Sequence, residues 1–198
     1  MTWIRLYALI LVLAGCTSAP TEIRYYLLSS DLPNVTRQEE FGSNTHIAVG
    51  PIIVPDYLDQ PLIVTVNDGG TLNLSENDRW ASPLSHGIQA LLISRLTDRL
   101  SGARVAAFPS TQGFIHKVRV AVEILRLDGS LGDLVTLHAR FQVLDSVSGL
   151  TVYEQDVHLK EPVAGVATAQ LVAAQRTATL ALADAVINYF DSLASDPD

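Results

Sequence analysis

Cysteine is almost absent from this chain, because Cys16 is the only one among 198 residues. Cys16 directly follows an apolar segment near the amino terminus, and we assign it below to a membrane anchor. The rest of the chain then has no thiol for a disulfide, a thiolate metal ligand or a cysteine nucleophile. The sequence therefore excludes these three kinds of site from the folded part.

A transmembrane anchor is also missing from the amino-terminal segment. The apolar run at residues 6–14 has nine residues, whereas a membrane-spanning helix needs about 20. Arg5 precedes the run and small residues follow it, which is the pattern of a secretory signal. We therefore expect residues 1–15 to be a signal peptide that is removed from the mature protein.

Positive charge is scarce, with 13 Lys and Arg against 21 Asp and Glu and a formal net charge of −8. A protein with this charge is repelled by the phosphates of nucleic acid, so we expect no nucleic-acid partner. The same charge argues against a polybasic contact with anionic lipids. Attachment to a membrane must then depend on a covalently bound lipid.

Local signatures of catalysis are absent too. The sequence has no Gly-x-Ser-x-Gly elbow and no glycine-rich loop followed by Lys-Ser or Lys-Thr. The histidines stand far apart, with no other histidine or cysteine three or four residues away: His46, His86, His116, His138 and His158. We predict no catalytic residues, no metal and no cofactor. A periplasmic hydrolase with dispersed Ser, His and Asp residues is the alternative.

His138 and His158 are the one pair that the predicted strands could bring together. Both fall on the polar side of neighbouring strands. A solvated strand face is the favoured interpretation over a binding site.

Periodicity predicts an α/β (α+β) fold with a single mixed, mostly antiparallel sheet and two long helices packed against it. The predicted strands lie at residues 24–28, 46–54, 62–66, 71–74, 104–108, 118–124, 135–143 and 153–159. Segments 46–54 and 104–108 are separated by a helix, so we expect them to lie parallel. Pro51 and the pair Ile124-Leu125 interrupt their strands and indicate bulges or bends.

The first predicted helix begins at Ser82-Pro83, with Ser82 as its cap, and carries leucines at spacings of three and four up to Gly102. Trp80 lies just ahead of it. We favour a role for Trp80 in packing the helix start onto the core, with a contact to a partner protein as the alternative. The second helix, at residues 168–193, has an alanine-rich stripe that suits packing on the sheet, and a contact in a homo-oligomer is the alternative.

The residues Leu13-Ala14-Gly15-Cys16 are similar to the lipobox of bacterial lipoproteins. In that group the cysteine sulfur receives a diacylglycerol and the new amino terminus is acylated. Several acyl chains give a lasting anchor, since one chain binds a membrane only marginally. We therefore assign residues 16–23 to a lipidated cysteine and linker, and residues 24–198 to a single globular periplasmic domain.

Several motifs together resemble the PqiC lipoproteins, which are auxiliary components of ABC-type and MCE-type lipid transport systems. The motifs are the lipobox, Tyr25-Tyr26-Leu27, Val54-Pro55-Asp56-Tyr57-Leu58, Trp80-Ala81-Ser82-Pro83-Leu84 and the alanine-rich final helix. The resemblance implies a non-catalytic lipoprotein on the outer membrane, facing the periplasm, with an MCE-domain protein of a PqiB type as its partner. Thr17 after the cysteine agrees with export to that membrane.

From these motifs we select Pro55, Asp56, Tyr57 and Trp80 as candidate partner-binding residues. Direct carriage of lipid in an apolar groove of the domain is a further alternative.

Overall fold

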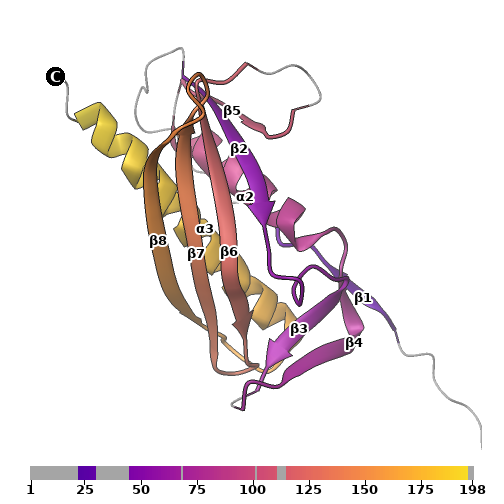
Figure 1. Cartoon of the computed structure of the whole chain (residues 1–198). Coiled ribbons are helices and arrows are strands. Elements are labelled where there is room, and N and C mark those ends of the chain that lie inside the picture. The colour runs from indigo at the N-terminus through magenta and orange to yellow at the C-terminus, as the bar shows by residue number, and fades with distance from the viewer. Residues whose placement is uncertain (1–21, 30–44, 68, 101, 111–114, 196–198) are drawn as a thin grey trace, which may run out of the picture.

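A five-stranded sheet with two helices on one face forms the larger part of the protein (Figure 1). The computed structural model describes residues 22–29, 45–67, 69–100, 102–110 and 115–195. The strand order in this sheet is β5-β2-β6-β7-β8. The bounds are β2 His46–Ile53, β5 Arg104–Ala107, β6 Val118–Gly129, β7 Leu134–Asp145 and β8 Thr151–Pro162, and the helices are α2 Leu84–Arg99 and α3 Thr168–Ser195.

Alternation along the meander decides which face of this sheet is covered. In β7 every second side chain is buried, namely Val135, Leu137, Ala139, Phe141 and Val143. The intervening residues lie on the other face, which the helices leave open (Figure 1). Complete burial of a side chain such as Phe141 contributes about 1.5–3 kcal/mol. The prediction of one apolar and one solvated face is confirmed.

A second, three-stranded sheet lies beside the first and has the order β1-β4-β3. It contains β1 Arg24–Tyr26, β3 Leu62–Val66 and β4 Leu72–Trp80. The prediction of a single sheet is therefore wrong, although the mixed α and β class holds. The predicted 62–66 and 71–74 hairpin forms, but β4 continues to Trp80 and pairs in parallel with β1 instead of joining the larger sheet. The first strand ends at Tyr26, two residues earlier than expected.

The predicted parallel pair is present, because β2 and β5 run parallel with Ile47 opposite Val105. Both predicted irregularities are present as well. The register of β2 against β6 shifts between Val49 and Ile52, and that of β6 against β7 shifts between Ile124 and Arg126. The Gly50–Pro51 peptide bond within the first irregularity is cis.

The start of α2 differs from the sequence-based expectation. Pro83 occupies the N-cap position, and no side chain caps the helix, so Ser82 does not have the role that we assigned to it. Proline fixes the backbone angle φ close to −65° and has no backbone N–H of its own to satisfy, so it is tolerated at the start of a helix. The predicted stop is confirmed at Gly102, whose φ of 89° favours glycine.

Helix α3 packs against both the sheet and α2. Its predicted stripe is buried at Leu171, Ala174, Ala178 and Leu182, and the adjacent Val172, Ala183 and Val186 are buried as well. The buried surface is wider than one stripe because α3 contacts two neighbours. Arg95 of α2 donates two hydrogen bonds to Asp184 of α3, at 2.8 and 3.0 Å. The intramolecular interpretation of the alanine-rich face is therefore confirmed.

The predicted signal peptide at residues 1–15, Cys16 and residues 17–21 of the linker lie outside the described residues. The assignment of the anchor stays a prediction, as does the division of the chain at residue 24. Neither described helix combines the length and the hydropathy required to cross a bilayer.

Candidate docking site

The turn at residues 55–58 connects the two sheets through Tyr57. The Leu58 amide donates to the Pro55 carbonyl at 2.9 Å, and the Leu58 side chain is buried. The Tyr57 hydroxyl donates a 2.5 Å hydrogen bond to Oδ2 of Asp128 at the end of β6. Burial, and secondly this hydrogen bond, raise the pKa of Tyr57. The Tyr57 hydroxyl therefore makes a bond within the protein, whereas the Asp56 side chain is exposed to solvent.

Trp80 ends β4 and belongs to the core, with 7% of its surface exposed. Its amide donates to the Pro61 carbonyl at 2.7 Å, and the next amide, of Ala81, donates to the Tyr26 carbonyl at 2.8 Å. These bonds hold Trp80 between β1 and the segment that leads into β3. The packing role that we favoured for Trp80 agrees with this position.

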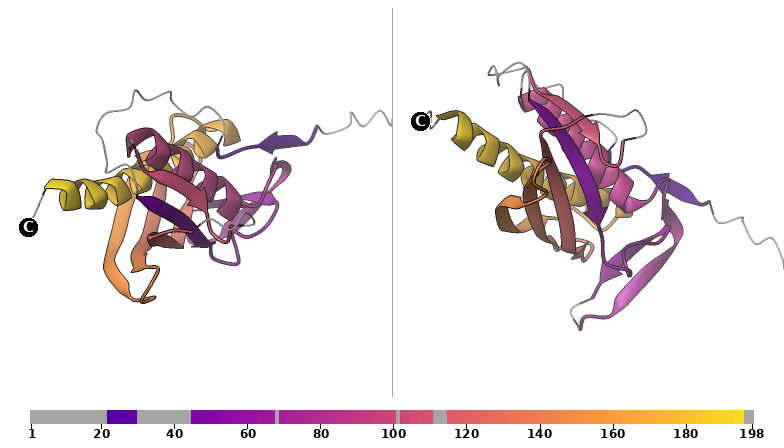
Figure 2. Two further views of the ribbon diagram at one scale, coloured as in Figure 1. Left: turned by 90° about the horizontal axis from the view of Figure 1, so that it is seen from above. Right: turned by 45° about the horizontal axis from the view of Figure 1, so that its top comes forward.

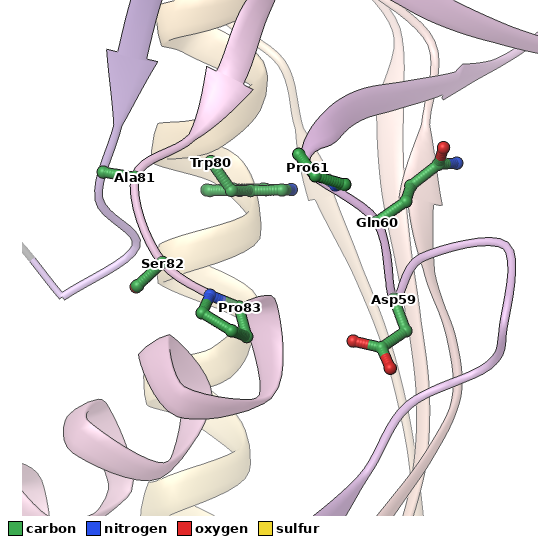
Figure 3. A pocket seen from close by; sticks show the side chains of 7 residues that line it. All are labelled: Asp59, Gln60, Pro61, Trp80, Ala81, Ser82 and Pro83. Atoms are coloured by element: carbon green, nitrogen blue, oxygen red, sulfur yellow. The ribbon is translucent and has the colours of Figure 1, made fainter.

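The exposed edge of Trp80 lines a pocket of about 260 Å³, which we call the Trp80 pocket. Its lining residues come from two segments, Asp59, Gln60 and Pro61 on one side and Trp80, Ala81, Ser82 and Pro83 on the other. Figure 3 shows the indole pointing toward Pro61 and the Asp59 carboxylate pointing toward Pro83. The pocket therefore combines apolar rings with a single carboxylate.

The volume of the Trp80 pocket limits what it accommodates. Pockets for drug-sized ligands have volumes of about 300–1,000 Å³, and this one is slightly smaller. A groove that carries a whole lipid would need a longer apolar cavity. One side chain or a short turn of a partner protein is a better fit.

Polar contacts beneath the pocket fix the strand that carries Trp80. Asp78, two residues earlier, is buried and accepts hydrogen bonds from Arg24 Nε at 2.6 Å, Tyr26 at 3.3 Å and Ser75 Oγ at 3.1 Å. Burial of Asp78 opposes its ionisation. Hydrogen bonds from Arg24, Thr168 and Ser75 outweigh burial and hold the pKa of Asp78 below its ordinary value. The charged carboxylate therefore stabilises the end of β4.

The structure brings only part of the predicted set together. Trp80 lines the pocket, whereas Pro55, Asp56 and Tyr57 do not. The three residues directly after that motif, Asp59, Gln60 and Pro61, line it instead, and sequence reasoning missed them. The one available signal was Pro61, because proline restricts the backbone and is found at the start of a strand.

The histidines do not form a metal site in the part of the chain that the structure describes. His138 and His158 lie opposite each other on β7 and β8, with ring centroids 3.8 Å apart and stacked. The described residues include no group of three or more His, Cys, Asp or Glu side chains positioned to hold a metal ion. The pair lies on the open face of the sheet, as expected for these strands.

With this geometry in view, comparison with known proteins identifies the family. Residues 26–187 match the family model of the ABC-type transport auxiliary lipoprotein component. The chain belongs to this family. The match includes both segments of the Trp80 pocket.

Two curated relatives are intermembrane transport lipoproteins. The chain is 31% identical over 97 residues to PqiC of Escherichia coli strain K12, and to PqiC of Shigella flexneri to the same extent. The aligned part spans about half of each protein, 49% of this chain and 51% of the relative.

Solved structures share the fold of this transport auxiliary lipoprotein. Protein XCC0632 from Xanthomonas campestris superimposes with a TM-score of 0.66 at 17% identity, covering 83% of this chain and 92% of the other. An uncharacterised protein gives a TM-score of 0.69 at 19% identity, covering 85% and 99%. At these identities the likeness establishes the fold alone.

Proposed function

We propose that this chain is a membrane-anchored, non-catalytic component of an intermembrane lipid transport system of the MCE and ABC type. In this proposal acyl chains on Cys16 hold it on the outer membrane, facing the periplasm. The Trp80 pocket receives part of an MCE-domain protein of a PqiB type. Family membership and the similarity to PqiC support the transport role.

The observation that carries the proposal is the composition of the Trp80 pocket. Binding energy in protein interfaces concentrates on aromatic anchors in well-packed pockets. Here an indole and two prolines, Pro61 and Pro83, form a small preformed hollow on the surface. Their positions are fixed by backbone hydrogen bonds, so docking would order few side chains.

An adaptor of this kind acts by position and not by chemistry. The pocket holds Asp59 as its one acidic group and no histidine. The Asp59 carboxylate adds specificity for a partner that has a basic or amide group next to its apolar contact. This arrangement suits recognition of a protein surface.

Blocking the pocket without disturbing the core tests the proposal. Asp59 is exposed and its carboxylate points into the pocket (Figure 3), so Asp59→Lys should place a charge of the opposite sign in the docking surface. Asp133 is an exposed aspartate in the turn between β6 and β7, outside the pocket, and Asp133→Lys is the matched control. We expect Asp59→Lys to lose co-purification with the MCE partner from detergent-solubilised membranes, whereas Asp133→Lys retains it.

Thermal unfolding of both variants checks that each remains folded. Co-purification of the partner with folded Asp59→Lys at the native level would overturn the assignment of the pocket. If no MCE protein co-purifies even with the unchanged chain, the adaptor function itself is wrong.

A further inference from the structure

Strand β1 is firmly held on its inward side. Arg24 and Tyr26 lie on the same side of the small sheet as Asp78, and both bond to it. Arg176 of α3 donates to the Leu28 carbonyl at 2.8 Å just after the strand. The buried Leu28 side chain packs closely against Gly87 of α2. A Cβ atom added at position 87 would lie only 3.0 Å from the Cβ of Leu28. The position of β1 is therefore fixed by contacts to three elements.

The outward side of the same strand carries exposed apolar side chains. Ile23, Tyr25 and Leu27 alternate with the inward residues, and their exposed fractions are 43%, 63% and 47%. We call the surface formed by Ile23, Tyr25 and Leu27 the β1 face. Neighbouring exposed apolar side chains on a strand with a fixed position are typical of a surface that contacts a protein or a membrane.

The cationic side chain of Arg79 adjoins this face. Tyr25 is paired in register with Arg79 of β4, so the two side chains lie on the same side of the small sheet. The Arg79 Nε is buried and has no hydrogen-bond partner among the described residues. A buried donor left unsatisfied costs about 1–3 kcal/mol. The residue as a whole is only half-buried, and guanidinium groups at a surface suit phosphate oxygens as external acceptors especially well.

The position of β1 in the chain indicates which surface supplies that acceptor. Ile23 lies seven residues after Cys16, so a fully extended connection reaches about 25 Å at most. Figure 2 shows β1 at the opposite end of the molecule from the carboxyl-terminal end of α3. A bilayer that holds Cys16 is therefore within reach of this end and is present there at high effective concentration.

We propose that the β1 face lies on the membrane that carries the anchor. Ile23 and Tyr25 enter the boundary between head groups and acyl chains, where tyrosine is enriched in membrane proteins. Arg79 donates to a lipid phosphate beside them. The inference rests on the proposed attachment at Cys16, and it sets the orientation of the domain on the membrane, which attachment alone does not.

A fluorophore on the β1 face of the full mature lipoprotein tests this orientation. Cys16 is the only cysteine and is blocked by lipid under the proposal, so Ile23→Cys offers one reactive thiol. The labelled protein is reconstituted into vesicles of phosphatidylethanolamine and phosphatidylglycerol that contain a nitroxide-labelled phosphatidylcholine. Val147→Cys, at a 95% exposed valine in the turn between β7 and β8, is the matched control.

We expect the label at residue 23 to lose most of its emission to the nitroxide lipid and the label at residue 147 to keep it. Adding Arg79→Gln should reduce the quenching at residue 23. Arg140→Gln, at an arginine on the open face of the large sheet, should not change it.

Equal quenching of the two labels in vesicles that carry the protein would overturn the inference and leave the anchor intact. A blue shift at residue 23 without quenching would also overturn it, because a second copy or a partner protein would then cover the face. Protein that fails to float with the vesicles lacks the anchor, which overturns the proposed attachment and this inference together.

Discussion

Thr168, the first residue of α3, donates a 2.5 Å hydrogen bond from its hydroxyl to Oδ2 of Asp78 in β4. The two residues are 90 positions apart in the chain. This bond joins the small sheet, which carries the Trp80 pocket, to the helix that covers the large sheet. Asp78 therefore holds the candidate docking site on the rest of the fold.

Replacing the Asp78 carboxylate should change how stability depends on pH. The pKa of Asp78 lies below its ordinary value of 3.8, so the charged form adds stability that is complete above this value. That stability is lost as the pH falls through the folded-state pKa. We expect Asp78→Asn to destabilise the protein by about 1–3 kcal/mol near neutral pH and to flatten the loss of stability in acid. Urea unfolding at a series of pH values measures both effects.

Asp156→Asn is the control for this experiment. The pKa of Asp156 is also lowered, chiefly by the hydrogen bond from Arg140, but this pair is exposed on the open sheet face. Its replacement should change neutral stability much less than Asp78→Asn does. Equal acid sensitivity of Asp78→Asn and the unchanged protein would contradict the role given to Asp78.

Removing the Tyr57 hydroxyl should weaken the connection between the two sheets. Tyr57→Phe leaves the buried Asp128 carboxylate with Arg126 as its remaining side-chain partner among the described residues. We expect a loss of about 1–3 kcal/mol in the free energy of unfolding, because a buried acceptor loses a donor. Tyr25→Phe removes the hydroxyl of an exposed tyrosine and should stay within about 0.5 kcal/mol of the unchanged protein. Similar losses for the two variants would show that the contact with Asp128 contributes nothing.

Truncation of Trp80 should affect the core more than any change at the pocket rim. Trp80→Ala removes a buried indole and should cost about 3–5 kcal/mol. Trp80→Phe keeps a ring and should cost clearly less. Far-ultraviolet circular dichroism during urea unfolding measures both variants. Unchanged stability of Trp80→Ala combined with lost partner association would show that the indole serves the interface alone.

Periodicity predicted the strands well, but it did not predict which strands pair. Strand β7 and helix α2 each have one solvated side and one covered side. The alternation in β7 and the leucine spacing in α2 follow from this difference and are visible in the sequence. The pairing of β1 with β4 depends on contacts between Arg24 and Asp78, 54 residues apart, and no local pattern encodes such a contact. For this reason the second sheet was missed.

The candidate site was predicted only in part for a similar reason. Trp80 was selected from the motif at residues 80–84, just ahead of a helix start, and it does line the pocket. Tyr57 was selected from the motif at residues 54–58, yet its hydroxyl bonds to Asp128. A motif indicates that residues matter without separating those that support a site from those that form its surface.

Loss of the lipid attachment residue should misplace the whole protein. We expect Cys16→Ala to incorporate no radiolabelled palmitate and to be released from membranes or to stay uncleaved in the inner membrane, because acyl chains supply the lasting anchor. Serine substitution at the neighbouring Thr17 is the control and should label normally. Labelling of Cys16→Ala at the native level would show that the lipid is attached elsewhere.

The final prediction concerns the absence of catalysis. An adaptor depends on its anchor and contact surface, so substitution of a single histidine should leave its activity intact wherever the protein folds. His138→Gln and His158→Gln are the most demanding cases, because these two rings stack on the open sheet face. We expect each variant to restore outer-membrane integrity in a deletion strain, whereas deletion of residues 17–21 should not.

Immunoblots of fractionated membranes must accompany this complementation, since a low level of protein would mimic a loss of function. His86→Gln is a useful additional variant because His86 is exposed near the start of α2 and is not among the residues that line the Trp80 pocket. A histidine variant that is folded, abundant and correctly located yet inactive would favour a hydrolase or a metal site over an adaptor. Full complementation by all of them would instead direct the search for function to surfaces, beginning with the Trp80 pocket.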